Sequence, residues 1–236
     1  MKNLNLTIII VAILVVLGFL IGIFMIKGTS QTLTATGNYQ MSVMPDEALV
    51  YLTIETRSTS ADQAKNDNAL ISQKVLDSLS SLIDSKSIET ENYNIYPEYD
   101  WNNGKQTLKG YVASNNIKIK INDFSIIGKV IDSSVDSGAL VSYINFELST
   151  AKNNEYKSIA LAEASKDAKK KAESIATGLG KKIGSLISVS SSDYNYMPYP
   201  LYRAESSDVA VKQVATNIQP RSLDISATVN VVYNLK

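Results

Sequence analysis

The 236-residue sequence contains no cysteine and no histidine. Without these side chains it can form no disulfide, thiol nucleophile, common zinc site or Ser-His triad. The formal net charge is zero, which excludes the basic surface of proteins that bind nucleic acid by counterion release. Acid-base chemistry would rest on carboxylates, lysines, tyrosines and hydroxyls alone. We therefore expect no enzyme, no cofactor, no metal and no nucleic-acid partner.

One long apolar run lies near the N-terminus. It reads LTIIIVAILVVLGFLIGIFMI over residues 6–26 and contains no charged residue. As a helix it would cross the ~30 Å hydrocarbon core of a bilayer. It exceeds the roughly 7 to 15 apolar residues of a signal peptide. The run predicts an uncleaved membrane anchor over residues 1–28; a cleaved and secreted form is the less favoured alternative.

Charges beside this run indicate its orientation. Lys2 and the terminal amine precede it and Lys27 follows it, a small bias that places the N-terminus in the cytoplasm and the remainder outside the cell membrane. All 23 acidic residues follow Lys27, so the outer part is mildly acidic. We expect residues 29–45 to be a spacer that enters the first strand, and residues 46–236 to form one extracytoplasmic domain with a long loop at 190–221.

Strand-like and helix-like periods alternate between residues 47 and 149. EALVYLTIETR has period two, whereas the next segment has apolar residues at helical spacing behind a capping box of Ser60 and Gln63. NYNIYPEYDWNNGKQTLKGYVASNN reads as a long hairpin turning at NNGK, with Pro97 typical of an edge or bulged strand. A short helix and the strand ALVSYINFELS follow. The order β-α-β-β-α-β predicts an α+β fold, mainly antiparallel sheet with helices on one face.

The remaining chain has the order α-β-β. Alanines recur every four residues from Ala160 to Ala176, which lets a helix approach its neighbour closely before Gly178 and Gly180 end it. The segments GSLISVS and LDISATVNVVYNL predict two strands, the last of which would complete the sheet. The segment between them is rich in tyrosine and proline, and a loop this long is usually functional or disordered.

Two tyrosine-rich windows are the candidate interaction surface. Tyr93, Tyr99 and Trp101 share one face of a predicted strand. Such a row could stack against a sugar or another ring of a ligand. The period-two alternation of the strand favours the alternative that the rings cover the sheet or a subunit contact. The loop contributes four further tyrosines: Tyr194, Tyr196, Tyr199 and Tyr202. These residues either contact a partner or a membrane surface or belong to a loop without a binding role, and the sequence favours neither interpretation.

Four carboxylates could be imagined as one cluster for Ca²⁺ or acid-base work. They are Asp46, Glu47, Glu98 and Asp100. Their spacing matches no metal-binding loop, so solvated strand ends explain them better. The segment KDAKKK at 166–171 is diluted by acidic neighbours and is interpreted as a solvated helix face.

Several segments in order resemble the SIMPL domain family, which includes periplasmic immunogenic and oxidative-stress defence proteins. They include ATGNYQMSVMPDEA, a helix with Ala64 and Asn68, LKGYVASNNIKIKI, AEASKDAKKKAESIATGLG and NIQPRSLDISATVNVVYNL. The resemblance runs from about residue 34 to the end. Asn38, Tyr39 and Arg221 stand where glycine is common in the family, so the first and last strands are expected to bend differently.

The resemblance implies an exported or envelope-associated protein. The family has no established catalytic residues to carry over, and a ring-like assembly of one member implies homo-oligomers. We therefore expect a non-enzymatic envelope module, linked to stress defence and to an unidentified envelope partner. The alternative is a tethered protein that captures a small molecule or glycan on its aromatic surface. An envelope enzyme using Asp46, Glu98 or Asp100 is the least favoured class.

Overall fold

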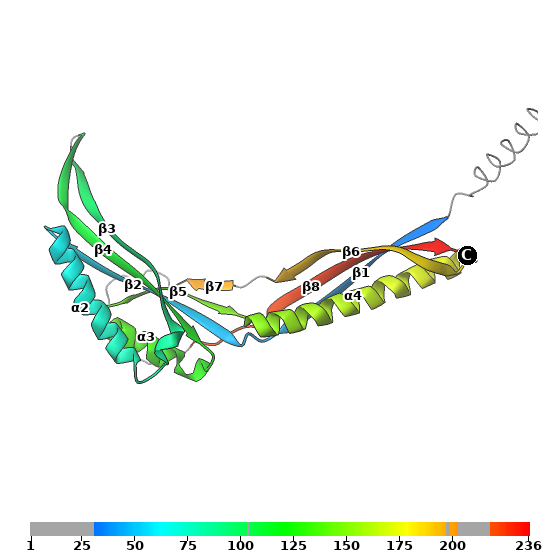
Figure 1. Cartoon of the computed structure of the whole chain (residues 1–236), viewed down its shortest axis with the longest axis horizontal. Helices are drawn as coiled ribbons and strands as arrows, with labels where there is room; N and C mark the ends of the chain where they lie inside the picture. Colours follow the sequence, from blue (N-terminus) through cyan, green and yellow to red (C-terminus); the bar gives the residue numbers. More distant parts are fainter. Residues whose placement is uncertain (1–30, 103, 197–198, 203–217) are drawn as a thin grey trace, which may run out of the picture. The chain divides into compact units, whose positions relative to one another are not determined.

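The computed structural model describes residues 31–102, 104–196, 199–202 and 218–236 (Figure 1). The predicted membrane span at residues 6–26 lies outside these ranges. Within the described ranges, every helix is too short or too polar to traverse a bilayer. The elements follow one another as β1 (Thr32–Val43), β2 (Glu47–Ser58), α2 (Ala61–Leu79), η1 (Ser85–Ser87), β3 (Ile88–Asn102), β4 (Lys105–Ile121), η2 (Phe124–Ile126), α3 (Ile127–Asp136), β5 (Leu140–Glu147), α4 (Thr150–Gly178), β6 (Ile183–Tyr196), β7 (Tyr199–Tyr202) and β8 (Leu223–Leu235).

The chain divides into two compact units. The terminal unit comprises residues up to Asn38 together with 163–192 and 228–236, and the central unit comprises 39–162 and 193–227. Strands form two sheets, one of five strands and one of three. The α+β class with antiparallel strands is confirmed, but the expectation that the last strand completes a single sheet was wrong. Period-two alternation shows that a segment is a strand; it does not show which sheet the strand joins.

The five-stranded sheet of the central unit has the order β3-β4-β2-β5-β7, and its pairs are antiparallel. Its first four strands with α2 and α3 form the predicted β-α-β-β-α-β unit. One sheet face and the two helices bury a common apolar core. Its members include Val50, Leu52, Ile54, Val75, Leu79, Ile117, Ile119, Ile127 and Val130.

Local signals in the sequence correctly placed several ends and turns of this unit. Ser60 caps α2 by accepting a hydrogen bond from the Gln63 N–H at 3.2 Å. The β3–β4 hairpin turns at Gly104, whose φ of +78° glycine adopts without strain. Pro97 lies on β3, which is an edge strand with a register shift after Glu98.

Asn68 ties helix α2 to the sheet. It is fully buried, and its side-chain amide donates to the carbonyl oxygens of Ile54 at 2.8 Å and Ala113 at 3.0 Å. The side chain thus satisfies backbone acceptors on two neighbouring strands, β2 and β4. A buried amide with its partners in place holds the helix at one position over the sheet.

The second sheet has the order β1-β8-β6. Strands β1 and β8 are antiparallel. The Leu235 N–H donates to the Gln31 carbonyl oxygen at 2.8 Å and the Thr36 hydroxyl donates to Asn230 Oδ1 at 2.6 Å, so residue numbers rise along one strand as they fall along the other. The predicted spacer at 29–45 is therefore mostly strand β1. One face of the strand carries threonine and asparagine, and the other carries Leu33, Ala35, Tyr39 and Val43, so the period-two signal of a half-buried strand is present in the sequence.

Helix α4 meets this sheet through the predicted alanine stripe. In the terminal unit Ala164, Ala168, Ala172 and Ala176 are at most 1 % exposed. A Cβ placed on Gly37 of β1 would lie 2.0 Å from the Ala164 carbonyl oxygen and 2.3 Å from the Ala168 nitrogen. Strand and helix backbones thus touch where both side chains are minimal, which confirms the predicted close approach. The helix ends at Gly178, and Gly180 follows with a φ of +68°.

Part of the predicted loop at 190–221 is strand. Strand β6 continues through Tyr196, and Tyr199–Tyr202 forms β7 beside β5. Pro200 within β7 has no N–H to donate. Among the described strands β7 lies at the sheet edge, where proline is tolerated when its nitrogen faces away from the neighbouring strand. The segment 203–217 lies outside the described residues.

Candidate functional site

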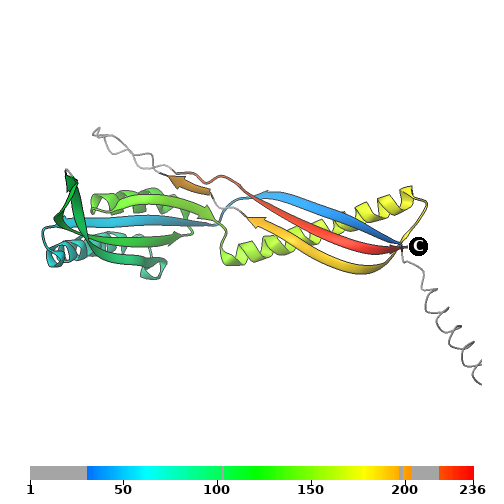
Figure 2. The same ribbon diagram turned by 90° about the horizontal axis from the view of Figure 1, so that it is seen from above.

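Residues of strand β2 point alternately to the two faces of the central sheet. Its even-numbered residues from Ala48 to Ile54 enter the core with α2 and α3. Its odd-numbered residues therefore lie on the other side, here called the second face. Figure 2 shows both helices on the same side of this sheet. The residues of β2 on the second face are Glu47, Leu49, Tyr51, Thr53, Glu55 and Arg57.

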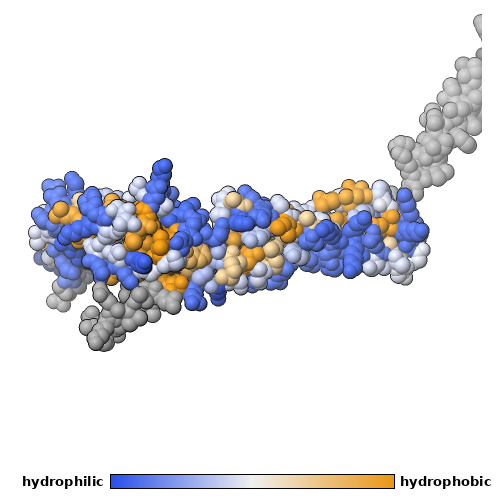
Figure 3. All heavy atoms as spheres, turned by 90° about the horizontal axis from the view of Figure 1, so that it is seen from below, coloured by the Kyte–Doolittle hydropathy of each residue, from blue (hydrophilic) through white to orange (hydrophobic). Residues whose placement is uncertain are grey.

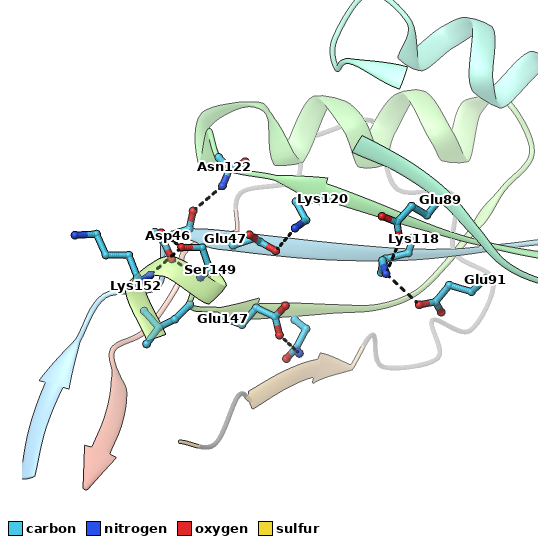
Figure 4. A network of polar contacts seen from close by, with 12 residues as sticks. Asp46, Glu47, Glu89, Glu91, Lys118, Lys120, Asn122, Glu147, Ser149 and Lys152 are labelled. Atoms are coloured by element: carbon cyan, nitrogen blue, oxygen red, sulfur yellow. Dashed lines mark hydrogen bonds and ion pairs between the residues drawn. The ribbon is translucent and has the colours of Figure 1, made fainter. Parts of the chain in front are cut away.

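Ion pairs connect neighbouring strands on the second face (Figure 4). Lys118 of β4 lies 2.7 Å from Glu89 and 3.6 Å from Glu91, both on β3. The hydrogen bond to Lys118 lowers the pKa of Glu89, and the same bond raises the pKa of Lys118. Further along β4, Lys120 lies 3.0 Å from Glu47 of β2. These pairs neutralise one another and favour one strand register.

Two carboxylates face each other at the end of this ladder. Glu47 of β2 lies directly opposite Glu147 of β5, and the Glu47 side chain is almost fully buried. Burial, followed by the charge of Glu47, raises the pKa of Glu147. The Asn145 amide donates to Glu147 at 3.4 Å, while the Asn145 carbonyl oxygen is buried without a partner among the described residues. Protonation of Glu147 would relieve the repulsion between the carboxylates.

Asp46 has a structural task beside this pair. Its carboxylate accepts from the backbone N–H and from the hydroxyl of Ser149, both at 2.7 Å. Ser149 in turn accepts from the Lys152 N–H at 3.3 Å, so it caps the start of α4. The carboxylate therefore fixes the first turn of a helix, and Figure 4 shows it pointing at that turn.

Two tyrosines stack at the centre of the second face. The rings of Tyr51 on β2 and Tyr143 on β5 lie 4.1 Å apart with an interplanar angle of 18°. Burial, with a smaller contribution from Tyr143, raises the pKa of Tyr51 to about 12. Sequence reasoning missed this pair. The odd positions of EALVYLTIETR are its only local signal, because the pairing of β2 with β5 brings the rings together.

The imagined four-carboxylate cluster is not assembled. Glu98 lies beside Arg57 and Lys109, each at 3.4 Å. Its register partner is Gly110, next to the Tyr111 that pairs with Ser58. Glu98 is therefore at the end of β2 opposite to Glu47, about 35 Å away along a twelve-residue strand. In the described part of the chain, no three acidic, histidine or cysteine side chains gather as metal ligands would.

Exposed rings occupy β3, which is an edge strand of the five-stranded sheet among the described residues. Tyr93, Tyr99 and Trp101 are 43 %, 46 % and 67 % exposed. Tyr96, whose even number places it on the other face of the strand, is exposed as well. We call the following set the aromatic edge: Tyr93, Ile95, Tyr96, Tyr99, Trp101 and, on β4, Leu108. In the space-filling view of Figure 3, apolar patches of the molecule lie between hydrophilic ones.

The other candidate tyrosines lie apart from the aromatic edge in the fold. The hydroxyl of Tyr194 bonds to the side chain of Asn153, and its ring lies 5.5 Å from the Lys157 ammonium. The hydroxyl of Tyr196 accepts from the Leu148 N–H at 2.7 Å, and burial raises its pKa to about 12. Both rings therefore pack near the start of α4. Tyr199 and Tyr202 pair by backbone register with Phe146 and Tyr143 of β5.

Comparison with known proteins agrees with the sequence resemblance. The chain is 25 % identical over 208 residues to the uncharacterized protein YggE of Escherichia coli K12, with 86 % of this chain and 83 % of that protein covered. It is 27 % identical over 216 residues to the 26 kDa periplasmic immunogenic protein of Brucella melitensis, with 86 % and 84 % covered. The SIMPL model, described as a protein of unknown function (DUF541), matches residues 33–233. The chain belongs to the SIMPL family.

Proposed function

We propose that this chain is a membrane-anchored, extracytoplasmic and non-enzymatic interaction module, which assembles with further copies of itself through β3. The observation that carries the proposal is the aromatic edge. Strand β3 is fifteen residues long and ends the five-stranded sheet, with β4 on one side. Its exposed rings extend from Tyr93 to Trp101.

A free strand edge offers unpaired backbone groups to another strand. Proteins usually protect such an edge with charge, proline or a covering element. The carboxylates of β3 near its start are engaged by Lys118, and Glu98 is engaged by Arg57 and Lys109. Beyond Asn92 the exposed residues of β3 are four aromatic rings together with Asn94, Ile95, Pro97 and Asp100. Exposed tyrosine and tryptophan are the side chains most enriched at protein interfaces.

Location outside the membrane rests on sequence and on relatives. Residues 6–26 are long and apolar enough to span a bilayer. The Brucella relative bears the name of a periplasmic protein. These features together support an anchored domain outside the cytoplasm.

Several polar groups of the described fold serve structural contacts. Asp46 holds the first turn of α4, Glu47 pairs with Lys120, and Glu98 lies between two cations. Catalysis by carboxylates needs an acid and a base at one reacting centre. The separation of Glu98 from Asp46 by the length of β2 favours a non-enzymatic role.

Native mass of the full chain in nanodiscs or mild detergent tests self-assembly. We expect an oligomer, and we expect the double variant Tyr99→Ser/Trp101→Ser to shift it towards the monomer by weakening the apolar contact at the edge. The control is Leu70→Ser, since Leu70 is 64 % exposed, close to Trp101 at 67 %, but lies on α2. The variants should keep the wild-type circular dichroism spectrum.

Two results would contradict the proposal. A wild-type chain that stays monomeric at every concentration has no self-assembly to explain. A monomer whose Tm rises when a glycan or ring-bearing small molecule is added would favour the tethered binding protein, because a ligand that binds only the folded state stabilises it.

A further inference from the structure

One end of the terminal unit gathers three lysines and an exposed leucine. The end of α4, the start of β6, the end of β8 and the start of β1 meet there (Figures 1 and 2). Leu235 donates its N–H to Gln31 at 2.8 Å, and Lys182 and Lys236 exchange two backbone hydrogen bonds of 2.9 and 2.8 Å. We call Leu179, Lys181, Lys182 and Lys236 the lysine tip.

The backbone holds the lysine tip in place. Gly180 adopts a φ of +68°, and the Lys181 N–H donates to the Ala176 carbonyl at 2.8 Å, which closes the C-terminus of α4. The paired backbones of Lys182 and Lys236 fix the other two lysines. All three lysines are exposed, so their ammonium groups extend from a rigid base into solvent.

The charged side chains of the lysine tip are all positive. Residues 31–36, 177–182 and 231–236 contain no aspartate or glutamate. Leu179 is 63 % exposed beside the lysines. An apolar side chain flanked by lysines suits the boundary between lipid headgroups and acyl chains, where lysine stems lie along apolar surface and the ammonium groups remain in water.

Chain length restricts where this end can be. Only residues 27–30 separate the apolar run from Gln31, the residue bonded to Leu235. Even fully extended, this connection reaches no more than about 18 Å. If residues 6–26 cross the bilayer, the lysine tip therefore lies close enough to the membrane for its side chains to reach the lipid headgroups. This holds whatever the direction of the strands relative to the membrane.

We propose that the lysine tip binds the membrane surface, with its three ammonium groups on the phosphates of anionic phospholipids and Leu179 in the headgroup region. This inference rests on the membrane anchor of the proposed function. Juxtamembrane lysines attract anionic lipid, each changing the binding equilibrium by about fivefold. The interaction fixes the start of β1 to the membrane instead of leaving it on a free tether.

The absence of cysteine makes a direct measurement possible. The full chain carrying Leu179→Cys, labelled with a polarity-sensitive fluorophore, is placed in nanodiscs of phosphatidylcholine alone or mixed with phosphatidylglycerol. We expect a blue-shifted emission and protection from an aqueous quencher with the anionic lipid. A label at Ser190→Cys, eight residues beyond Lys182 on an exposed part of β6 and so about 26 Å from it along the strand, should respond to neither lipid.

Charge variants test the cause. Replacing Lys181, Lys182 and Lys236 together by Gln should lower the ratio of bound to free tip on the order of a hundredfold, three lysines at about fivefold each. The matched control replaces Lys166, Lys169 and Lys170 by Gln, which removes the same charge from the exposed side of α4. Added salt should act as the first triple variant does.

The outcomes separate the two proposals. A chain that alkaline carbonate releases from membranes has no anchor, and the proposed function fails first. A chain that stays inserted, with the Leu179 label exposed to the quencher in both lipids, overturns the lysine tip alone. Protection that depends on protein-to-lipid ratio and not on lipid charge would assign this surface to a protein contact and equally overturn it.

Discussion

Glu147 shows how one side chain acquires its chemistry from a neighbour on another strand. Its sequence context, NFELS, is that of an ordinary strand end. The pairing of β2 with β5 places Glu47 opposite it, and burial removes water from the carboxylate. Both effects disfavour the charged form and raise its pKa. No pattern within the β5 segment contains this information, because the partner lies a hundred residues away in sequence.

Stability should therefore depend on pH through this group. The folded pKa of Glu147 lies above its ordinary value of 4.5, so between the two values the folded state binds more protons than the unfolded state. The free energy of unfolding then falls as pH rises from about 4.5 through the folded pKa. We expect Glu147→Gln to raise the urea midpoint at neutral pH and to have no effect at pH below that window.

Glu89→Gln supplies a variant of opposite sign. The pKa of Glu89 is lowered by Lys118, so its contribution to stability is present above the unfolded pKa and is lost as pH falls through the folded one. We expect this variant to lower the urea midpoint at neutral pH by a small amount, because the pair is at the surface.

Urea midpoints of Glu147→Gln and wild type that differ equally at every pH would contradict the assignment for Glu147.

Among the elements, α4 and β1 approach each other closely in the terminal unit. Gly37 has no Cβ, and the alanines opposite it have no more than one methyl group. The alanine spacing predicted a close approach correctly. It did not predict the partner, because alanine spacing does not indicate which strand the helix packs against; the hydrogen bonds between β1 and β8 place β1 in that sheet.

Adding one methyl group at this contact should be destabilising. The new Cβ of Gly37→Ala would overlap backbone atoms of Ala164 and Ala168, which cannot move as a flexible side chain can. We expect a loss of about 1–3 kcal/mol in the free energy of unfolding, measured by urea denaturation. Gly178→Ala is the control, since its Cβ meets no atom within 4 Å. Equal midpoints for the two variants would contradict the close approach.

The predicted orientation in the membrane, with the N-terminus in the cytoplasm and the domain outside, concerns the whole molecule. Lys2 and Lys27 give only a small charge bias. Externally added protease should digest the chain beyond Lys27 in intact cells or in spheroplasts, and leave the segment within the membrane protected. Protection of everything after Lys27 until the membrane is permeabilised would place the domain inside and reverse the orientation.

Sequence patterns were sufficient to predict the α+β class, the β-α-β-β-α-β order, the hairpin turn and the alanine face of α4. Each depends on a period or a turn residue within a short segment, where neighbouring residues carry the physical signal. Tertiary structure alone decided that the strands form two sheets, that β7 joins β5, that Tyr51 stacks on Tyr143 and that Glu47 faces Glu147. These depend on which strands become neighbours, and alternation is the same for every possible partner.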